Sequence, residues 1–349
     1  MHDGRVEQSL IFSDQSPRYS EYQTLTRNTI ALPTNTKRTS VAKTVFDIWR
    51  ARLKLRQRYK AESRIVHVIM GSPWDIFYLP VAKKNGATIL FTVHDAARHQ
   101  GEENAVLDWI SNRLIGLADH LIVLSDFTGK ALKERFNIQV PVHTMSGALI
   151  LNESEPAPAK TWNGKKPLRL LFFGRIFHYK GLSLLLEAFE LVKKNSGKLV
   201  ELTVAGEGDL TPYREALMRC PEVKIINSWI SDEAKEAIFA SHDINMVPYL
   251  DTFTSAVTLD GMWAGMPTIA TPLPAFEQQL HDEENALIAT EITALALADK
   301  IEMISNSKEL YNKLAIGANV KARTLSAPFV ANMWHDLFAK IANEKSRNQ

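Results

Sequence analysis

The sequence predicts an α/β protein made of two doubly wound domains that face each other across a cleft. From about residue 60 onward, short apolar and β-branched runs alternate with helical stretches, as in parallel sheets wound by crossover helices. The chain has 349 residues, more than one ordinary core accommodates. The stretch 152–167 is rich in Pro, Ala, Asn and Lys and lacks an apolar period, which is typical of an interdomain linker.

The first domain is expected to span residues 1–151. Short β-rich runs bounded by turn residues, with amphipathic stretches between them, predict its elements. The expected strands are Ser9–Ser13, Thr29–Leu32, Arg64–Met70, Thr88–Val93, His120–Leu124 and Val140–Met145. The expected helices lie near 41–62, 75–85, 103–118 and 126–136.

The second domain is expected to span residues 168–325, and its strands are near-continuous apolar runs, as in sheets covered on both faces. A terminal helical segment, 326–349, is predicted to pack back toward the domain junction. The expected strands are 168–173, 200–205, 223–228, 244–248, 267–271 and 285–289. The expected helices are 181–195, 211–220, 231–241, 254–264 and 291–306. The terminal helix, 329–341, carries along one face Phe329, Met333, Trp334 and Phe338.

Composition and charge exclude several classes of protein. Hydrophobic residues make up 45% and charged residues 23%, the profile of a folded chain. A formal net charge of +2 gives no bulk attraction for nucleic acid. The single cysteine, Cys220, fits a reducing compartment, and no apolar run reaches the ~20 residues of a membrane-spanning helix. We therefore expect a cytoplasmic protein, soluble or held peripherally at the inner face of the membrane.

The first functional signal is a turn that follows the apolar run 168–173. Gly174 ends this expected strand, and Arg175 and Lys180 stand in the turn before a helix begins at Gly181. A helix N-terminus offers unpaired N–H groups and a partial positive charge, and nearby cations add charge-assisted hydrogen bonds to phosphate oxygens. The turn therefore predicts a diphosphate site. The alternative is two surface cations on an ordinary loop.

The second signal follows the expected strand 244–248. Two hydroxyl residues, Thr254 and Ser255, precede Ala256 at the start of a helix, an arrangement that suits a phosphate. Asp260 lies within that helix, where its carboxylate can reach a ribose hydroxyl pair. The alternative is an ordinary helix cap followed by a solvated aspartate.

Together these signals resemble the nucleotide-binding domain of the family-four retaining glycosyltransferases, glycosyl transferases group 1, with the GT-B architecture of two Rossmann-like domains. In that family a Gly-Arg-x-Lys-Gly type of turn is followed by a Glu-x7-Glu pair and an Ala-rich run ending in Pro-Val-Ile-Ala. The run here is Gly261–Ala270. The resemblance covers about 168–325 well and 64–150 more loosely.

The resemblance implies roles for particular residues. Arg175 and Lys180 would hold the donor diphosphate, and Asp260 would take the place of the ribose-binding glutamate. The first acid of the family pair is replaced here by Thr252, and Ser255 replaces a glycine. Because that first acid contacts the transferred sugar in the family, Thr252 puts the donor and the activity in question.

Further candidates lie at the same edges of the expected sheets. Gly206, after the strand 200–205, has a packing role or a donor contact, and the incomplete glycine pattern there disfavours a nicotinamide enzyme. The resemblance assigns His94 to the transferred sugar. On the acceptor side, Trp74 can stack on a sugar face or simply pack, and Asp95 and His99 are weaker candidates.

Two features of the first domain bear on partners. The stretch 41–60 is strongly basic and amphipathic, which suits contact with an anionic membrane surface or, alternatively, a core-facing stripe with a solvated basic face. Family members usually open with a strand, a glycine-rich loop and a long helix. Only a polar leader and the short run 9–13 stand here, so the first βα unit is expected to be missing.

The sequence thus predicts a metal-independent hexosyltransferase without a cofactor. It would move a sugar from a nucleotide diphosphate to a saccharide or lipid-linked acceptor with retention, in surface polysaccharide or glycan synthesis. No Asp-x-Asp, Cys-x-x-Cys, His-Glu-x-x-His or Walker pattern supports metal or other nucleotide chemistry. Two alternatives stay open: an inactive or weakly active relative that binds a partner, and a sugar-nucleotide epimerase of the same architecture.

Overall fold

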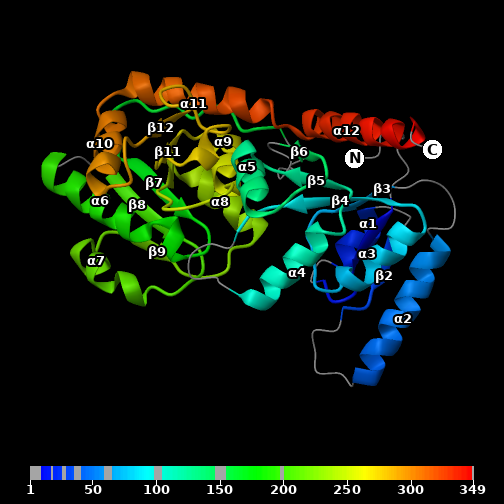
Figure 1. Cartoon of the computed structure of the whole chain (residues 1–349). Coiled ribbons are helices and arrows are strands. Elements are labelled where there is room, and N and C mark those ends of the chain that lie inside the picture. The colour runs from blue at the N-terminus through cyan, green and yellow to red at the C-terminus, as the bar shows by residue number, and fades with distance from the viewer. Residues whose placement is uncertain are drawn as a thin grey trace.

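The computed structural model shows two α/β domains, each built on a parallel sheet, with the C-terminal helices running along one side of both (Figure 1). The doubly wound fold expected from the sequence is confirmed. The structure describes residues 9–16, 19–25, 29–34, 41–58, 65–97, 104–145, 155–196 and 200–347.

The second domain has a six-stranded sheet whose first strand, β7, lies at the centre. The strand order is β12-β11-β10-β7-β8-β9, so the chain winds outward first to one side and then to the other. The strands are β7 (Leu168–Phe173), β8 (Val200–Ala205), β9 (Lys224–Ile226), β10 (Ile244–Val247), β11 (Thr268–Ala270) and β12 (Ala286–Ile288).

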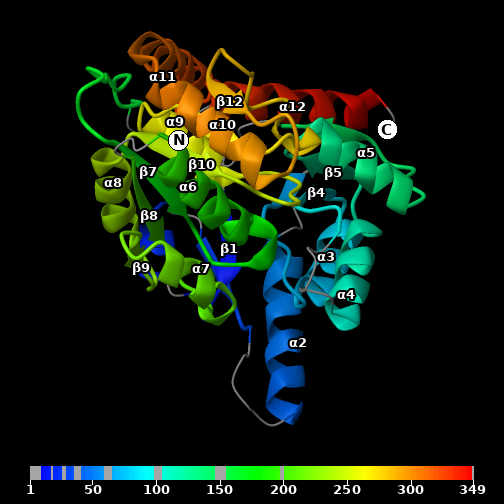
Figure 2. The ribbon, with the colours of Figure 1, turned by 90° about the vertical axis from the view of Figure 1, so that its left-hand side faces the viewer.

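Helices cover both faces of this sheet, which explains the continuous apolar runs of its strands (Figure 2). One face packs against α6 (Leu182–Ser196) and α10 (Ala294–Ser305), and the other against α8 (Asp232–Ser241) and α9 (Ala256–Trp263). Residues of α11 (Lys308–Arg323) belong to both cores. The short α7 (Arg214–Arg219) follows a 3-10 turn that contains Pro212, so the single helix expected at 211–220 is divided.

In the first domain, β3 (Ile65–Val68), β4 (Thr88–Val93), β5 (His120–Val123) and β6 (Val142–Thr144) form one parallel sheet in that order. A separate parallel pair joins β1 (Leu10–Ser13) to β2 (Thr29–Leu32). Within the described residues, β1 and β3 do not pair with each other. The helices are α1 (Tyr19–Leu25), α2 (Val41–Arg58), α3 (Asp75–Lys84), α4 (Ala105–Ile115) and α5 (Asp126–Arg135).

The C-terminal helix α12 (Ala327–Arg347) packs on the first domain, although its sequence follows the second. Leu337 and Ile341 share a buried cluster with Leu90 of β4 and Ile122 of β5. The ring of Trp334 lies 4.6 Å from that of His67 on β3. The residues of the first domain's own helices pack in a different cluster, so α12 covers a face of this sheet that α2–α5 leave to it.

The segment expected as a linker packs closely on the second domain over its described part, residues 155–167. The ammonium of Lys160 donates to the carbonyls of Phe239 and Ala240, each at 2.8 Å, where α8 ends. The Phe239 carbonyl also accepts from the N–H of His242, the C-cap residue, and the lysine adds a positive charge where the helix ends. Trp162 packs against Tyr311 of α11, with ring centroids 5.9 Å apart.

Candidate functional site

The candidate site is built where β7 and β8 end in the second domain, and two glycines bring the two loops into contact. Gly174 has φ 106° and Gly206 has φ 147°, conformations that side chains rarely adopt. A Cβ on Gly206 would collide with the carbonyl oxygen of Gly174. Just beyond, Ile176 bridges to Gly208, so the two strands are prolonged as a paired rim.

Lys180 lies behind this rim with most of its side chain buried. The residue is only 9% exposed, and its Nζ lies 5.1 Å from the centre of the Tyr249 ring. A Cβ on Gly174 would lie 2.6 Å from this nitrogen, so the glycine makes the space that the ammonium fills. Burial, and then the charge of Arg175, lower the pKa of Lys180 to about 8. Within the described part of the chain, no carboxylate or hydrogen-bond acceptor pairs with this cation.

Arg175 supplies a second, exposed cation at the same loop. Its guanidinium lies over the ring of Phe177, 4.7 Å from the centroid, and Phe177 stacks on Tyr179 at 6.0 Å. A cation over an aromatic face is held in place yet keeps its N–H groups available at the edges. The repulsion between Arg175 and Lys180 shows in the lowered pKa of the lysine. The loop thus holds two positive charges close together.

The start of α9 completes this group. Ser255 caps the helix, because its Oγ accepts a hydrogen bond from the N–H of Thr258. A Cγ atom of Val257, in the first turn, lies 3.8 Å from the position that a Cβ on Gly174 would take. Thr254 and Ala256 flank the cap, and the Val257 contact brings the first turn of α9 close to the loop that carries Lys180. The first N–H groups of a helix have no partner within it.

The helix that follows Lys180 directly is less accessible. Gly181 and Leu182, at the start of α6, are buried, and the backbone of Pro248 lies against Gly181. The N–H of Leu250 donates to the carbonyl of Tyr179 at 2.7 Å, which ties the two loops together over the helix start. The entry to α6 is thus packed against the loop that follows β10, and the first turn of α9 lies near the same loop as the cations. The role expected for the start of α6 stays a prediction.

Asp260 lies one turn further along α9 and pairs with Lys235 of α8, with Nζ and Oδ1 3.1 Å apart. Burial raises the pKa of the Asp260 carboxyl, while Lys235 acts in the opposite direction. Its charge also acts on the Tyr249 hydroxyl, which places the carboxylate on the same side of the loops. The ion pair with Lys235 holds the carboxylate in place and partly offsets the effect of burial on its pKa.

Family models match both halves of the chain. The model described as Glycosyltransferase Family 4 covers residues 6–148, and that described as Glycosyl transferases group 1 covers residues 167–307. Each matched segment corresponds to one of the two α/β domains of the structure. The chain belongs to glycosyltransferase family 4.

The comparisons with individual proteins agree on the fold of this family-4 chain. A phosphatidyl-myo-inositol mannosyltransferase of Mycobacterium leprae is 26% identical over 182 residues, which are 52% of this chain and about half, 48%, of that relative. HepE of Anabaena, in complex with UDP-glucose, superposes with a TM-score of 0.73 at 12% identity, covering 96% of this chain and 100% of its own. Sucrose-phosphate synthase of Thermosynechococcus elongatus superposes with a TM-score of 0.65 at 15% sequence identity, covering 90% of this chain and 84% of its own.

The first domain of this family-4 chain places its predicted residues at the ends of β3 and β4. His94 follows β4, and its Nε2 donates to the carbonyl of Ile69 at 2.7 Å, since a carbonyl only accepts. The other ring nitrogen is therefore left as an acceptor in the neutral imidazole. Asp95 is exposed beside it, and Trp74 is half-buried against the domain core, 6.4 Å from the ring of Phe77. His99 lies outside the described residues.

Thr252, which stands where family members have a sugar-contacting acid, is turned into its own loop. Its side chain is buried, and its hydroxyl donates to the carbonyl of Thr254 at 2.7 Å. The residue therefore stabilises the loop and offers no charge to a ligand.

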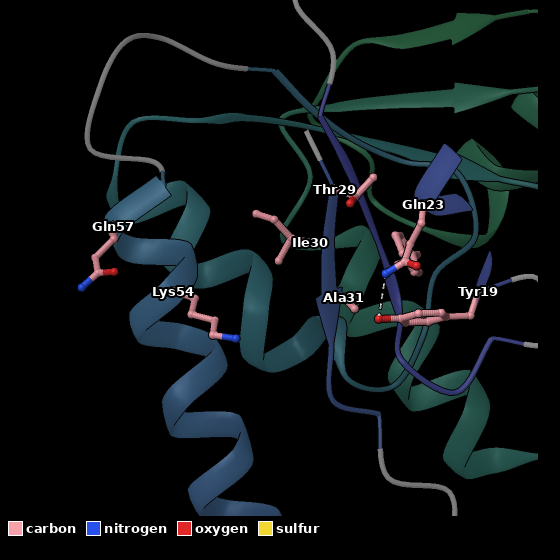
Figure 3. A pocket seen from close by; sticks show the side chains of 8 residues that line it. Tyr19, Gln23, Thr29, Ile30, Ala31, Lys54 and Gln57 are labelled. Atoms are coloured by element: carbon pink, nitrogen blue, oxygen red, sulfur yellow. Dashed lines mark hydrogen bonds between the residues drawn. The ribbon is translucent and has the colours of Figure 1, made fainter. Parts of the chain in front are cut away.

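The rest of the described chain offers no competing metal site and no membrane-spanning helix. No group of three or more His, Cys, Asp and Glu side chains gathers in these parts of the chain. None of their helices combines the length and apolarity that crossing a membrane requires. A hollow of about 580 Å³ opens between β2, α1 and α2, with Lys54 at its edge and Tyr19 bonded to Gln23 (Figure 3). It lies in the first domain, away from the paired cations.

Three residues near the cation loop were not among the predicted site residues. Tyr249, which follows the expected strand 244–248, has its ring 5.1 Å from the Lys180 ammonium. Lys235 is one of several helical lysines, and Phe253 is one of many phenylalanines. Only contacts between residues far apart in the sequence distinguish these three positions.

Proposed function

We propose that this family-4 protein transfers a hexose-type sugar from a nucleoside-diphosphate donor to a saccharide or lipid-linked acceptor, with retention of the anomeric configuration. The observation that carries the proposal is the buried, unpaired Lys180 near the start of α9. A buried charge without a partner is costly to the fold, so its retention favours a ligand that supplies the opposite charge.

The leaving diphosphate fits that requirement. As the glycosidic bond of the donor breaks, negative charge grows on the departing phosphate oxygen, and fixed positive groups stabilise it. Lys180 and Arg175 belong to one loop, and the first turn of α9 lies close to that loop. We propose that these groups provide the charge stabilisation without a metal ion, and that Asp260 accepts from the ribose hydroxyls while Lys235 keeps it ionised.

The relatives support the choice of substrates. HepE is seen with UDP-glucose, a nucleoside-diphosphate hexose, and the mycobacterial relative is named as a mannosyltransferase of phosphatidyl-myo-inositol. A hexose donor and a lipid-linked acceptor are therefore the first substrates to test here. Synthesis of a surface polysaccharide or another glycan in the cytoplasm is the process that such a reaction would serve.

Thermal stabilisation tests the proposal most directly. Protein mixed with UDP-, GDP- and ADP-sugars should melt higher with one of them, because a ligand at 100 times its Kd stabilises the native state by about 2.7 kcal/mol. Lys180→Ala should abolish the shift. The matched control is Lys224→Ala, which removes an exposed lysine of β9 that pairs with Glu201 of β8. No shift with any donor would remove the proposed function.

A second candidate is an inactive or weakly active relative that binds the nucleotide without turnover. The neutral, internally bonded Thr252 favours it, since the sugar end of the site lacks the family's carboxylate. Stabilisation by a nucleoside diphosphate together with undetectable transfer and donor hydrolysis would select this candidate.

We further propose that α2 brings the protein to an anionic membrane surface, where a lipid-linked acceptor would lie. Ala51 and Leu55 anchor the helix to the core, and the opposite face exposes Phe46 and Trp49, the latter by 56%. Figure 1 shows α2 extending away from the body of the molecule. The exposed basic residues along the helix are Lys43, Arg50, Arg52, Lys54 and Arg56. Aromatic side chains between cations suit the headgroup region of anionic lipids.

A further inference from the structure

We infer that Phe253 is a positioning residue. Its side chain anchors the loop before α9 in the first domain, and the loop thereby positions Thr252, at the sugar end of the proposed donor site. The residue belongs to the second domain by sequence. Its side chain is nevertheless only 8% exposed and lies in the buried cluster of the first domain, stacked on Phe127 of α5 at 5.8 Å and 29°. The inference rests on the proposed function, because the loop matters only if a donor binds there.

The backbone of Phe253 is held as firmly as its ring. Its carbonyl accepts hydrogen bonds from the hydroxyls of Ser125, at 3.0 Å, and Thr128, at 3.2 Å, both buried at the start of α5. The Ser125 oxygen also accepts from the N–H of Thr128 as the cap of that helix. A carbonyl at a helix N-terminus meets the favourable end of the helix dipole, so the contact is well matched.

The loop therefore has one attachment to each domain. On one side of Thr252, the N–H of Leu250 is bonded to Tyr179 in the cation loop of the second domain. On the other side, Phe253 is fixed to α5 of the first. Thr252 lies between the two attachments, and the α9 cap Ser255 follows two residues after Phe253. The placement of the sugar end is thus shared by both domains, whereas Arg175 and Lys180 depend on the second alone.

A neighbouring contact makes the role of Phe253 separable from the docking of the domains. Gln278 of the second domain exchanges two hydrogen bonds with Asp126, one with its N–H and one with its carboxylate, each at 2.8 Å. Neither hydrogen bond of this pair involves Phe253, so we expect the pair to persist when Phe253 is changed. Loss of the Phe253 ring should therefore loosen the loop without parting the domains.

The test compares Phe253→Ala with Phe253→Leu, which keeps an apolar group in the pocket. The alanine variant should lower kcat for transfer by up to about 100-fold, because small displacements of the reacting groups cost that much. Its KM for the donor and its Kd for the free nucleoside diphosphate should stay within about twofold, and leucine should restore most of kcat. Unchanged kcat overturns the inference, and so does an equal loss of diphosphate affinity, which would make Phe253 a support of the whole second domain.

Hydrogen exchange gives a measurement that does not depend on turnover. In Phe253→Ala, amides of 250–255 and of the first turn of α5 should exchange faster, while those of 174–180 should not change. Equal protection in both proteins overturns the coupling. If the native protein binds no nucleotide at all, the proposed function fails, and exchange still decides whether Phe253 holds the loop.

Discussion

Lys180 combines three conditions that rarely coexist in one side chain: burial, a neighbouring cation and the absence of a counter-charge within the described chain. Gly174 leaves room for its ammonium and Tyr249 provides a face to rest on, but neither neutralises it. Burial disfavours the charged form, and Arg175 adds to that effect. An unpaired charge at this position lowers the stability of the fold, and a bound anion would offset that cost.

The pH dependence of ligand binding should follow from the Lys180 pKa of about 8. Below this value the ammonium is charged and can bind a diphosphate. Affinity should fall by up to about tenfold per pH unit above it, until the higher pKa of the complex is passed. Calorimetric titration with a nucleoside diphosphate between about pH 7 and 10 measures this. Lys180→Arg should flatten the profile, because a guanidinium stays charged. A native profile as flat as that of the arginine variant contradicts the assignment.

The lowered pKa of Lys180 also makes the stability of the ligand-free protein depend on pH. Ligand affinity should fall with rising pH, whereas the free energy of unfolding should rise. The folded value lies below the unfolded value of 10.5, so between the two the native state binds fewer protons than the unfolded state. The destabilising contribution of Lys180 is therefore fully present below about pH 8 and is relieved as the pH rises through this window. Lys180→Met should remove this contribution, so the difference in unfolding free energy between variant and native protein should shrink toward high pH. A constant difference would speak against a buried charge.

Removal of Lys180 should also slow transfer. If its ammonium stabilises charge on the departing diphosphate, Lys180→Ala should raise the barrier by about 2.7–4 kcal/mol, or roughly 100- to 1,000-fold in kcat. Steady-state transfer from the donor found by thermal stabilisation measures it, with Lys224→Ala as the control. Turnover equal to that of the native protein would falsify the catalytic role.

At the scale of elements, the ends and faces of helices form most of the contacts at the proposed sites. The first turn of α9 lies near the cation loop, the start of α5 receives the Phe253 carbonyl, and the end of α8 accepts hydrogen bonds from Lys160. The faces of α2 differ in the same way, since Ala51 and Leu55 are buried while Phe46 and Trp49 are not. Each element thus has one side assigned to the fold and another left for a ligand or surface.

Membrane contact through α2 should depend on charge and on its aromatic side chains. Replacement of Arg50, Arg52 and Arg56 by Glu should abolish sedimentation with phosphatidylserine-containing vesicles, since each cation near anionic lipid contributes about 1 kcal/mol. Trp49→Ala should weaken binding less. The control is a double change of charge elsewhere, on α11, of the exposed Lys313 and the half-buried Lys321 to Glu. Equal binding to vesicles of neutral lipid would rule out the electrostatic part of the proposal.

At the scale of the whole molecule, segments that belong to or follow the second domain in sequence pack on the first domain. The helix α12 is made after the second domain yet covers a face of the first sheet, and Phe253 enters the core of the first domain from a loop of the second. The Asp126–Gln278 pair adds a polar contact beside it. Because the two domains share these packed contacts, changes in one are expected to alter the stability of the other.

The contribution of α12 can be measured by one buried side chain. Ile341 is 1% exposed among Leu90 and Ile122, so Ile341→Ala should lower the unfolding free energy by about 2–5 kcal/mol. Phe329→Ala, at a half-exposed position near the start of the same helix, should change it by about 0.5 kcal/mol or less. Denaturant melts of both variants provide the comparison. Similar losses for the two would show that the helix contributes through propensity rather than packing.

Much of the local structure could be predicted because its causes lie within short stretches of sequence. The bounds of β2, β4, β7 and β8 agree with the expected strands, since each is an apolar run ended by turn residues or glycine. The helix α1 was missed because its sequence, YSEYQTL, is mostly polar. The terminal helix α12 begins close to the expected residue but continues to Arg347. This extension was not predicted because the final turns are polar and carry no apolar period.

The amino-acid sequence by itself determined the alternation of strands and helices, the two sheets that follow from it, and the pair of cations after the central strand. These depend on hydrophobic period, glycine and charge within a few residues. Only the tertiary structure decided that Lys180 is buried without a partner, that the first turn of α9 lies near its loop, and that Phe253 belongs to the first domain's core. Burial and pairing depend on residues 70–130 positions apart along the chain, and no local pattern records such contacts.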